Sequence, residues 1–440
     1  MQSLPNGLRG RFGAQLQAVL DPVGSAQRWR REFSDPMTFP GMDGSMGIVT
    51  GSADGIRAIF SAPADTFEPF SSEQLRVVLG DGSLLIQSGA EHRAMRKVLM
   101  PPFHGQRMRV YGRHIQELAE QQTRHFRPGL PFVAQELMHS ISMQLIIQLV
   151  FGVTAPERIP EVMQRVDAFR RAISPTLILP MVFRFLRRDF WGFGPWATLQ
   201  RAIFGMRGFL AAETRRCREA NVERADILSL LVAARYDDGS PLDDEAIFDQ
   251  LRTLLLAGHS TTATALSWAF YFLAQEPEVR SRLRAELAAL GNDPTPEAIA
   301  QAPYLDAVCQ ETLRIRPLVG SVARRLRSPL RLLGYDLPAG FSVHAFVLWA
   351  HTNPAVFPEP ERFLPQRFLD RTYSPFEYLP FGGGHRRCIG AALALYEMKL
   401  VLATLIQRYT FELTSNKLIR IVQRDSLAPG TPIRMIVRPI

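Results

Sequence analysis

The stretch Phe381–Gly390, which reads Phe-Gly-Gly-Gly-His-Arg-Arg-Cys-Ile-Gly, constrains the fold of this chain most. Three consecutive glycines, Gly382 to Gly384, let the backbone turn tightly and bring bare N–H groups close to a sulfur. Arg386 stands beside Cys388, and residues 391–402 are strongly helical, which puts the thiol at a helix N-terminus. Cations and helix N-termini both lower the pKa of a thiol. The stretch therefore predicts a cysteine held as a thiolate.

Such a thiolate is either a nucleophile or a metal ligand, and no nearby residue looks like a general base paired to Cys388, which favours the ligand. An inert buried cysteine is the usual alternative. The spacing Phe-x-x-Gly-x-Arg-x-Cys-x-Gly is matched at all five fixed positions, which chance rarely produces. The stretch resembles the haem-ligand loop of the cytochrome P450 superfamily, in which the cysteine is the axial ligand of the iron.

The resemblance implies a mainly α fold with small β regions, formed as a single triangular-prism domain of residues 1–440 around haem. Strand-rich parts are expected near residues 36–50, 330–347 and 409–440. The expected cofactor is haem b, iron protoporphyrin IX, with Cys388 as the metal ligand. The other cofactor-binding residues expected near the loop and the facing helix are Phe381, Gly382, Arg386, Gly390 and Ala257.

Basic residues at three further places are candidates for binding the haem propionates. His92 and Arg96 lie four apart, on one face of a helix that ends at Pro101, although a solvated basic face is a frequent alternative. The stretch is similar to the family's propionate-binding helix. Arg324 and Arg386 match further propionate-binding arginines of the family, and arginine has the shape that suits carboxylates.

A long helix is predicted over residues 244–275, with small side chains in its middle. Ala257 and Thr261 are four apart, and Gly258 lies in the adjacent row. Small residues let a broad, flat group lie against the backbone, although close helix–helix packing is the alternative. Glycine and threonine also loosen a helix, because threonine can bond to the carbonyl four residues before it.

The run Ala257–Thr262 resembles the oxygen-activating segment of the family, Ala/Gly-Gly-x-acid-Thr. The resemblance makes Thr261 the catalytic threonine, with Ser260 and Gly258 beside it. Ser260 stands where the family carries an acid. A hydroxyl does not supply protons by ionising, so we expect protons to arrive through water, His259 or the substrate.

Glu311 and Arg314 are three apart on a predicted helix and can form an ion pair of a kind that is structural in many proteins. Together with Arg367 they resemble the family's Glu-x-x-Arg plus Arg triad. The resemblance gives these three residues a structural role behind the haem.

The substrate region is predicted from apolar residues. The resemblance places residues 173–196, which are aromatic and interrupted by Pro and Gly, as an apolar lid, with a buried helix–helix connection as the alternative. The expected pocket residues are Leu84, Leu254, Ala257, Val319 and Val322. They favour a lipophilic small-molecule substrate, with fatty acid, terpenoid and polyketide all open.

Charge and cysteine content limit the partners and the compartment. The net charge is +9, but there is no block of like charge and no nucleic-acid motif, so no nucleic-acid partner is expected. A positive surface suits an acidic electron-transfer protein. The three widely spaced cysteines favour a reducing cytoplasm. Residues 1–32 contain no membrane anchor, and we expect a monomer.

The resemblance implies a cytochrome P450 monooxygenase that activates O2 and hydroxylates or otherwise oxidises its substrate, as in secondary metabolism. Electrons would come from NAD(P)H through an acidic ferredoxin and its reductase, or through a flavodoxin. A peroxygenase or an isomerase/dehydratase without an electron partner is the alternative, which Ser260 favours and Thr261 argues against. A second alternative is a non-catalytic haem sensor or ligand carrier.

Overall fold

The computed structural model describes residues 4–8, 10–41, 45–68, 72–103, 105–153, 155, 157–173, 192–220, 226–236 and 238–439. Most of the predicted lid, residues 174–191, lies outside the described residues. The chain divides into two compact units. The sheet unit comprises Met1–Phe70, Met108–Met138 and Thr262–Ile440, and the helical unit comprises Ser71–Arg107 and His139–Thr261.

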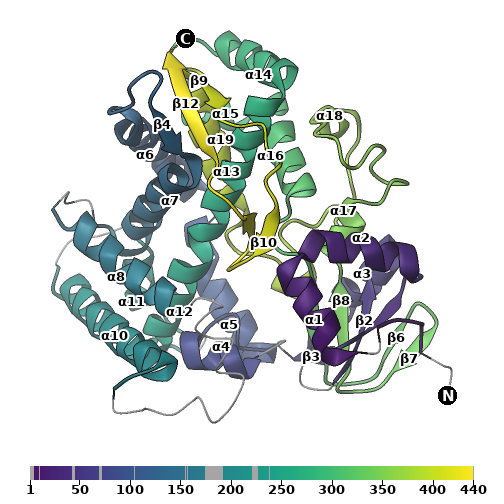
Figure 1. The fold of residues 1–440 in the computed structure, drawn as a ribbon. Coiled ribbons are helices and arrows are strands. Elements are labelled where there is room, and N and C mark those ends of the chain that lie inside the picture. Colours follow the sequence, from purple (N-terminus) through teal and green to yellow (C-terminus); the bar gives the residue numbers. More distant parts are fainter. Residues whose placement is uncertain are drawn as a thin grey trace. The chain divides into compact units, whose positions relative to one another are not determined.

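A five-stranded sheet in the sheet unit joins the start of the chain to residues 322–345 (Figure 1). Its strand order is β1 (Met37–Pro40), β2 (Met46–Thr50), β8 (Ser342–Ala345), β5 (Val322–Leu326) and β3 (Phe67–Glu68). β2 and β8 pair in parallel, and the other neighbours are antiparallel.

Helix α3 (Ala53–Ser61) packs on this sheet because its apolar residues recur on one face. The side chain of Ser52 caps the helix by accepting a hydrogen bond from the N–H of Gly55. Ile56, Ile59 and Phe60 enter a core cluster that also contains Leu379, nine residues before Cys388. The sheet core thereby reaches the cysteine loop.

The remaining strands of the sheet unit form three small sheets. β9 (Tyr409–Leu413) and β4 (Pro131–Val133) flank β12 (Arg434–Pro439). Two hairpins pair β10 (Ile421–Gln423) with β11 (Leu427–Pro429), and β6 (Leu330–Leu332) with β7 (Tyr335–Leu337).

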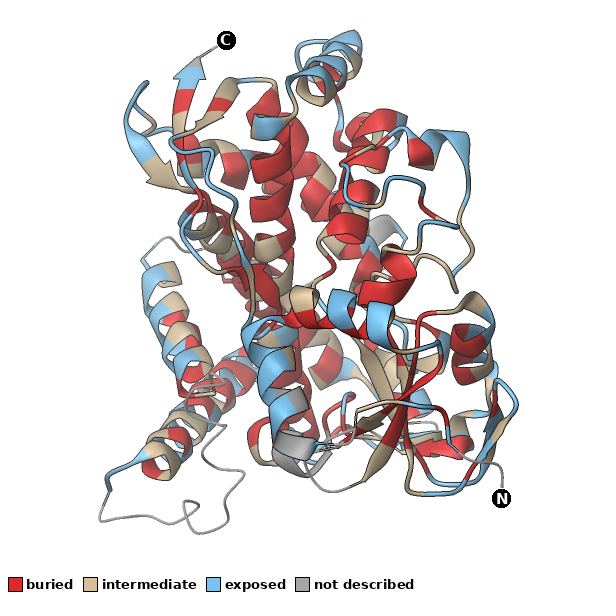
Figure 2. Ribbon diagram, turned by 45° about the vertical axis from the view of Figure 1, so that its right-hand side comes forward, coloured by how far each residue is buried: buried red, intermediate tan, exposed pale blue. Residues whose placement is uncertain are grey.

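The helices of the sheet unit include α19 (Ala391–Ile406), which follows the cysteine loop directly and is buried over most of its surface (Figure 2). The other helices with residues in this unit are α1 (Arg11–Leu20), α2 (Pro22–Glu32), α13 (Ser260–Gln275), α14 (Pro277–Ala289), α15 (Pro296–Ala300), α16 (Pro303–Ile315), α17 (Val347–His351) and α18 (Arg367–Asp370). Proline stands at the first turn of α14, α15 and α16, where its missing N–H costs no hydrogen bond.

The helical unit has no strand among its described residues. Its helices are α4 (Ser72–Leu79), α5 (Gly89–Leu99), α8 (Ile159–Ala172), α10 (Pro195–Glu219), α11 (Ile227–Ala233) and α12 (Asp244–Gly258). α6 (Gln106–Thr123) and α7 (Ala134–Phe151) have residues in both units. Helix α10 packs against α8, α11 and α12. None of the described helices is long and apolar enough to span a bilayer.

The predicted single helix over 244–275 is wrong in one respect, because the structure interrupts it at His259. Helix α12 ends at Gly258, His259 has φ −106° and ψ −48°, and α13 begins at Ser260. The predicted back-bond is confirmed, since the Thr261 hydroxyl donates to the Ala257 carbonyl at 2.8 Å. A side-chain bond of this kind competes with the helix ladder and loosens it.

Candidate haem site

The cysteine loop is closed by three backbone hydrogen bonds within the sheet unit. The N–H of Cys388 donates to the carbonyl of Phe381 at 3.0 Å, and that of Gly382 to the carbonyl of Leu379 at 3.0 Å. The N–H of Arg387 donates to Gly384 at 3.1 Å. The loop therefore turns back on itself and presents Cys388, which is exposed, just before the first turn of α19.

Two of the loop glycines are required by the backbone itself. Gly382 and Gly384 both have φ near +65°, a left-handed conformation that side chains oppose. A Cβ at Gly383 would overlap the ring of Phe60. At Gly390 a Cβ would meet nothing within 4 Å. The first three glycines shape the loop, whereas Gly390 leaves open space beside the cysteine.

Arg324 on β5 and Arg386 in the loop (η5, Gly384–Arg386) are neighbouring half-buried cations of the sheet unit. Burial, and then the charge of Arg386, lower the pKa of Arg324 to about 10. Burial also lowers the pKa of Arg386. A ligand that carries two carboxylates would offset both effects, because like charges in a poorly solvated place attract an anion. The residues present at this end of the loop therefore fit the propionates of haem.

The other predicted propionate ligands lie on α5 of the helical unit. His92 is buried and Arg96 is half-buried, whereas Arg93 and Lys97 between and beyond them are exposed. The helix thus turns two basic residues inward and two outward. A purely solvated basic face, the alternative for this stretch, does not describe His92 and Arg96.

The interrupted helix exposes one face of its middle. Ala257 is exposed, and Gly258, Ser260 and Thr261 are half-buried, in a helix whose earlier turns are almost entirely buried. These residues are therefore accessible to a ligand, as a catalytic role requires.

His259 points away from that face. Its side chain is about 200° around the helix from that of Thr261, since the two residues are two positions apart. Its Nδ1 faces the Leu255 carbonyl at 2.7 Å, and its ring lies edge-on to His139. Burial lowers the pKa of His259 to about 4, so the ring is neutral. The expectation that His259 passes protons to Thr261 is not supported by this geometry.

A hydrogen-bonded clamp that the sequence did not reveal joins α12 to the loop before α5. The N–H of Gly82 donates to Asp249 at 2.8 Å and the N–H of Leu84 donates to Gln250 at 3.1 Å. The amide of Gln250 also donates to the Gly82 carbonyl. The Ser83 hydroxyl donates to Thr253, at 2.7 Å, because the Thr253 hydroxyl itself donates to the Asp249 carbonyl.

The clamp changes which leucine is available to a ligand. Leu84, a predicted pocket residue, is only 7 % exposed, whereas Leu85 is 47 % exposed. Leu254, also predicted, is buried as well. The sequence contains one indication of the clamp, the polar side chains of Asp249, Gln250 and Thr253. Polar residues about one turn apart on a mainly apolar helix require hydrogen-bond partners.

The two predicted pocket residues of the sheet unit are accessible. Val319 is 48 % exposed. Val322 is half-buried, and its methyl groups lie 3.7–3.9 Å from the place of a Cβ on Gly382. Val322 therefore lies against the cysteine loop. Phe381, the first residue of that loop, is half-buried.

The predicted structural triad forms a fully buried charge network. Arg314 donates to Glu311 from Nε at 2.6 Å and from Nη2 at 2.8 Å, and Arg367 donates to it at 3.2 Å. The N–H of Leu364 adds a further bond to Glu311 at 2.8 Å. Buried ion pairs are stable only when their hydrogen bonds are complete, and here they are supplied by several segments.

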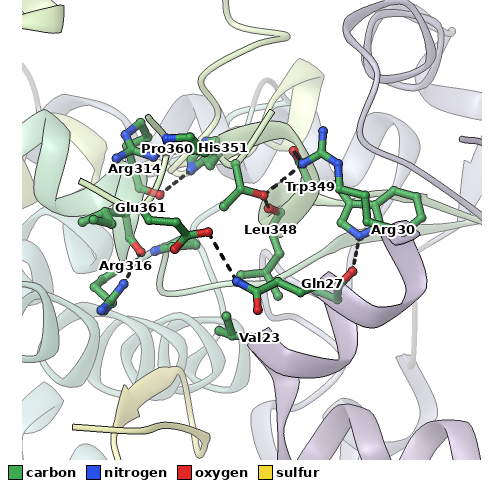
Figure 3. A pocket seen from close by; sticks show the side chains of 14 residues that line it. Val23, Gln27, Arg30, Arg314, Arg316, Leu348, Trp349, His351, Pro360 and Glu361 are labelled. Atoms are coloured by element: carbon green, nitrogen blue, oxygen red, sulfur yellow. Dashed lines mark hydrogen bonds between the residues drawn. The ribbon is translucent and has the colours of Figure 1, made fainter. Parts of the chain in front are cut away.

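A cavity of about 40 Å³ lies beside this network (Figure 3). Arg30, Arg316, Glu361 and His351 are among the residues that line it, and Gln27 donates to Glu361 at 3.3 Å. That volume holds a few water molecules at most. None of the predicted substrate residues lines the cavity, so it is not a substrate pocket.

Comparison with known proteins identifies the class. Residues 11–436 match the sequence model of the family described as cytochrome P450. Cytochrome P450 138 of Mycobacterium tuberculosis is 35 % identical over 374 residues, which cover 84 % of this chain and 80 % of that protein. Cytochrome P450 137 of the same species is 32 % identical over 444 residues, which cover 99 % and 90 %. The chain therefore belongs to the cytochrome P450 family.

Solved structures agree with this assignment. The retinoic acid bound cyanobacterial CYP120A1 superposes with a TM-score of 0.87 at 26 % identity, covering 99 % of both chains. The heme domain of cytochrome P450DA gives the same TM-score at 21 % identity, covering 99 % and 98 %, and supports the fold alone. The predicted mainly α fold of this family is confirmed. The chain is a cytochrome P450 monooxygenase, a class that uses haem iron, O2 and electrons from a redox partner.

Proposed function

We propose that this enzyme oxidises, most simply by hydroxylation, a lipophilic small molecule at a haem b whose iron is ligated by Cys388. The observation that carries the proposal is the closed loop that presents Cys388 at the start of α19, beside the cations of Arg324 and Arg386. Bound haem supplies the activation of O2, and a thiolate ligand favours O–O cleavage.

Cys388 would ligate the iron as a thiolate, the form that its position just before the N-terminus of α19 favours. Arg324 and Arg386 would hold the haem by its carboxylates, because arginine suits carboxylates in shape and charge. His92 and Arg96 on α5 are the remaining candidates for the donors that two propionates need.

In the proposed role, Thr261 would hold a water molecule that delivers protons for oxygen activation. Its hydroxyl donates to the Ala257 carbonyl, so the lone pairs of its oxygen can accept a hydrogen bond from that water. Ser260 does not ionise at neutral pH, and His259 faces the other way. Protons therefore reach Thr261 through water or through a group of the substrate.

The substrate is lipophilic, because the accessible residues Ala257, Val319, Val322 and Leu85 are apolar. One solved relative binds retinoic acid, an apolar chain that carries a carboxylate, which supports this class of compound. Electrons come from NAD(P)H through an acidic ferredoxin and its reductase or through a flavodoxin, since a chain of net charge +9 attracts an acidic partner.

The experiment compares two ways of driving turnover with compounds selected by a spectral-shift screen of lipophilic molecules. The proposal predicts product with NAD(P)H, ferredoxin and reductase, and a rate that falls as salt screens the charged encounter. Product with hydrogen peroxide alone, and none with the electron partners, would replace the proposal with a peroxygenase. Ser260, a hydroxyl in the acid position, is the observation that favours this second candidate.

A further inference from the structure

His351 lies between the buried charge network and the cysteine loop. It is the last residue of α17 and has no exposed surface. Its Nδ1 faces the carbonyl of Arg314 at 3.3 Å, and its Nε2 accepts the N–H of Leu379 at 2.9 Å. The guanidinium of Arg314 in turn donates to the carbonyl of His351 at 2.9 Å. Every polar atom of the side chain is therefore used.

These partners allow one form of the imidazole. The Leu379 N–H is a donor, so Nε2 must be an unprotonated acceptor, and Nδ1 must carry the proton because it faces a carbonyl. Burial, and then the charge of Arg314, lower the pKa of His351 to about 3. The ring is therefore neutral, and its two bonds persist throughout the physiological range.

The bonds continue from His351 to the cysteine. Leu379, which donates to His351, accepts from the N–H of Gly382 through its carbonyl, and the carbonyl of Phe381 accepts from Cys388. The ring of Tyr378 stacks on that of His351 at 5.3 Å, and the Tyr378 hydroxyl donates to the Gln310 carbonyl on α16. The start of the loop is thus tied to α16, the helix that carries Glu311.

We propose that His351 is a positioning residue for the haem ligand, which transmits the fixed geometry of the Glu311–Arg314 pair to the loop that holds Cys388. The inference rests on the proposed role of Cys388. Without the imidazole acceptor, the buried N–H of Leu379 loses its partner, which favours rearrangement at the base of the loop.

Two substitutions of His351 separate its hydrogen bonds from its packing. His351→Phe keeps a ring against Tyr378 and removes both bonds, whereas His351→Gln keeps an acceptor and a donor on an amide. The matched control is His344→Phe on β8. That histidine also has its pKa lowered by burial, to about 4, and its ring lies near Ser321 and Phe39.

The measurement is the rate at which the reduced carbon monoxide complex of the holoenzyme loses the red-shifted absorption of sulfur-bound haem during mild warming. The inference predicts about tenfold faster loss in His351→Phe, as expected for one orphaned buried donor. It predicts loss within about twofold of wild type in His351→Gln. In His344→Phe the thermal unfolding temperature falls, but the absorption is lost no faster below unfolding.

Equal rates in His351→Phe and wild type would overturn the inference, as would a loss in His351→Phe that occurs only together with unfolding. Wild-type protein without the red-shifted absorption would instead overturn the proposed function. Hydrogen exchange on wild-type holoenzyme is the second measurement, because it requires no variant to fold. The inference predicts that the Leu379 amide is as protected as that of Cys388, and rapid exchange at Leu379 would overturn it.

Discussion

The loop around Cys388 and the helix around Thr261 are built in opposite ways. The loop is closed by backbone bonds, shaped by two left-handed glycines and tied to a buried charge network through His351. The helix is interrupted at His259 and leaves Ala257 exposed. The proposed metal ligand must hold one geometry, whereas the segment proposed to admit oxygen, water and substrate needs an opening. The rigid loop around Cys388 and the interrupted helix around Thr261 thus meet different requirements.

The largest expected effect comes from the network behind the loop. Glu311→Ala leaves Arg314 and Arg367 as buried cations without their shared carboxylate, which costs about 3–5 kcal/mol. Urea unfolding should show a loss of that size, together with a low haem content of the purified protein. The control is Glu359→Ala, which removes an exposed ion pair with Arg362 and should leave the free energy of unfolding close to that of the wild type. Equal losses in the two variants would contradict the bracing role.

The second effect is on stability in mild acid. Burial lowers the pKa of His259 and His344 to about 4 and that of His351 to about 3. The unfolded chain therefore binds protons below pH 6.5 that the folded chain does not, and stability falls as pH decreases from 6.5 toward 4. Each residue contributes up to about 1.4 kcal/mol per pH unit. Urea midpoints measured from pH 7 to pH 5 check this, and constant stability would contradict it.

The third effect is on the yield of product per electron, and it tests whether the Thr261 hydroxyl takes part in proton delivery or only packs within the helix. Thr261→Ala should divert electrons to peroxide and lower product per NAD(P)H about tenfold, because general acid–base assistance has at least that magnitude. Ser267→Ala is the control, since its hydroxyl makes the same bond to the carbonyl four residues before it, but in a fully buried place. Unchanged coupling in Thr261→Ala would show that water or substrate alone manages the protons.

The smallest effect concerns the clamp on the loop before α5. Gln250→Ala removes the bonds to the Leu84 N–H and the Gly82 carbonyl, so Leu85 loses its fixed place. Substrate affinity, measured by spectral titration, should fall about threefold to tenfold while the carbon monoxide spectrum is unchanged. Gln407→Ala, which removes a bond to Leu287 in the sheet unit, is the control. Equal affinities would show that the clamp does not shape the site.

The sequence predicted the parts of the site that depend on local spacing. The five fixed positions around Cys388 and the three-residue step from Glu311 to Arg314 lie within single elements, so their pattern is legible along the chain. The back-bond from Thr261 to Ala257 follows from helix geometry for the same reason.

The parts that escaped prediction depend on contacts between distant residues. His351 and Leu379 are 28 positions apart, and Gly82 and Asp249 are 167 apart, so no local periodicity links them. In the irregular loop at Leu84 and Leu85 there is no regular period to show which side chain faces inward. The break at His259 was missed because residues 253–274 form one long, mainly apolar stretch, in which His259 and the serine and threonine residues after it do not mark a helix end.

The most direct measurement is the absorption spectrum of purified, reduced protein under carbon monoxide, recorded for the wild type and for Cys388→Ser. Sulfur ligation by this one residue predicts the red-shifted band in the wild type and its complete loss in the variant. A wild type without that band, or a variant that keeps it, would contradict the assignment of Cys388 as the iron ligand.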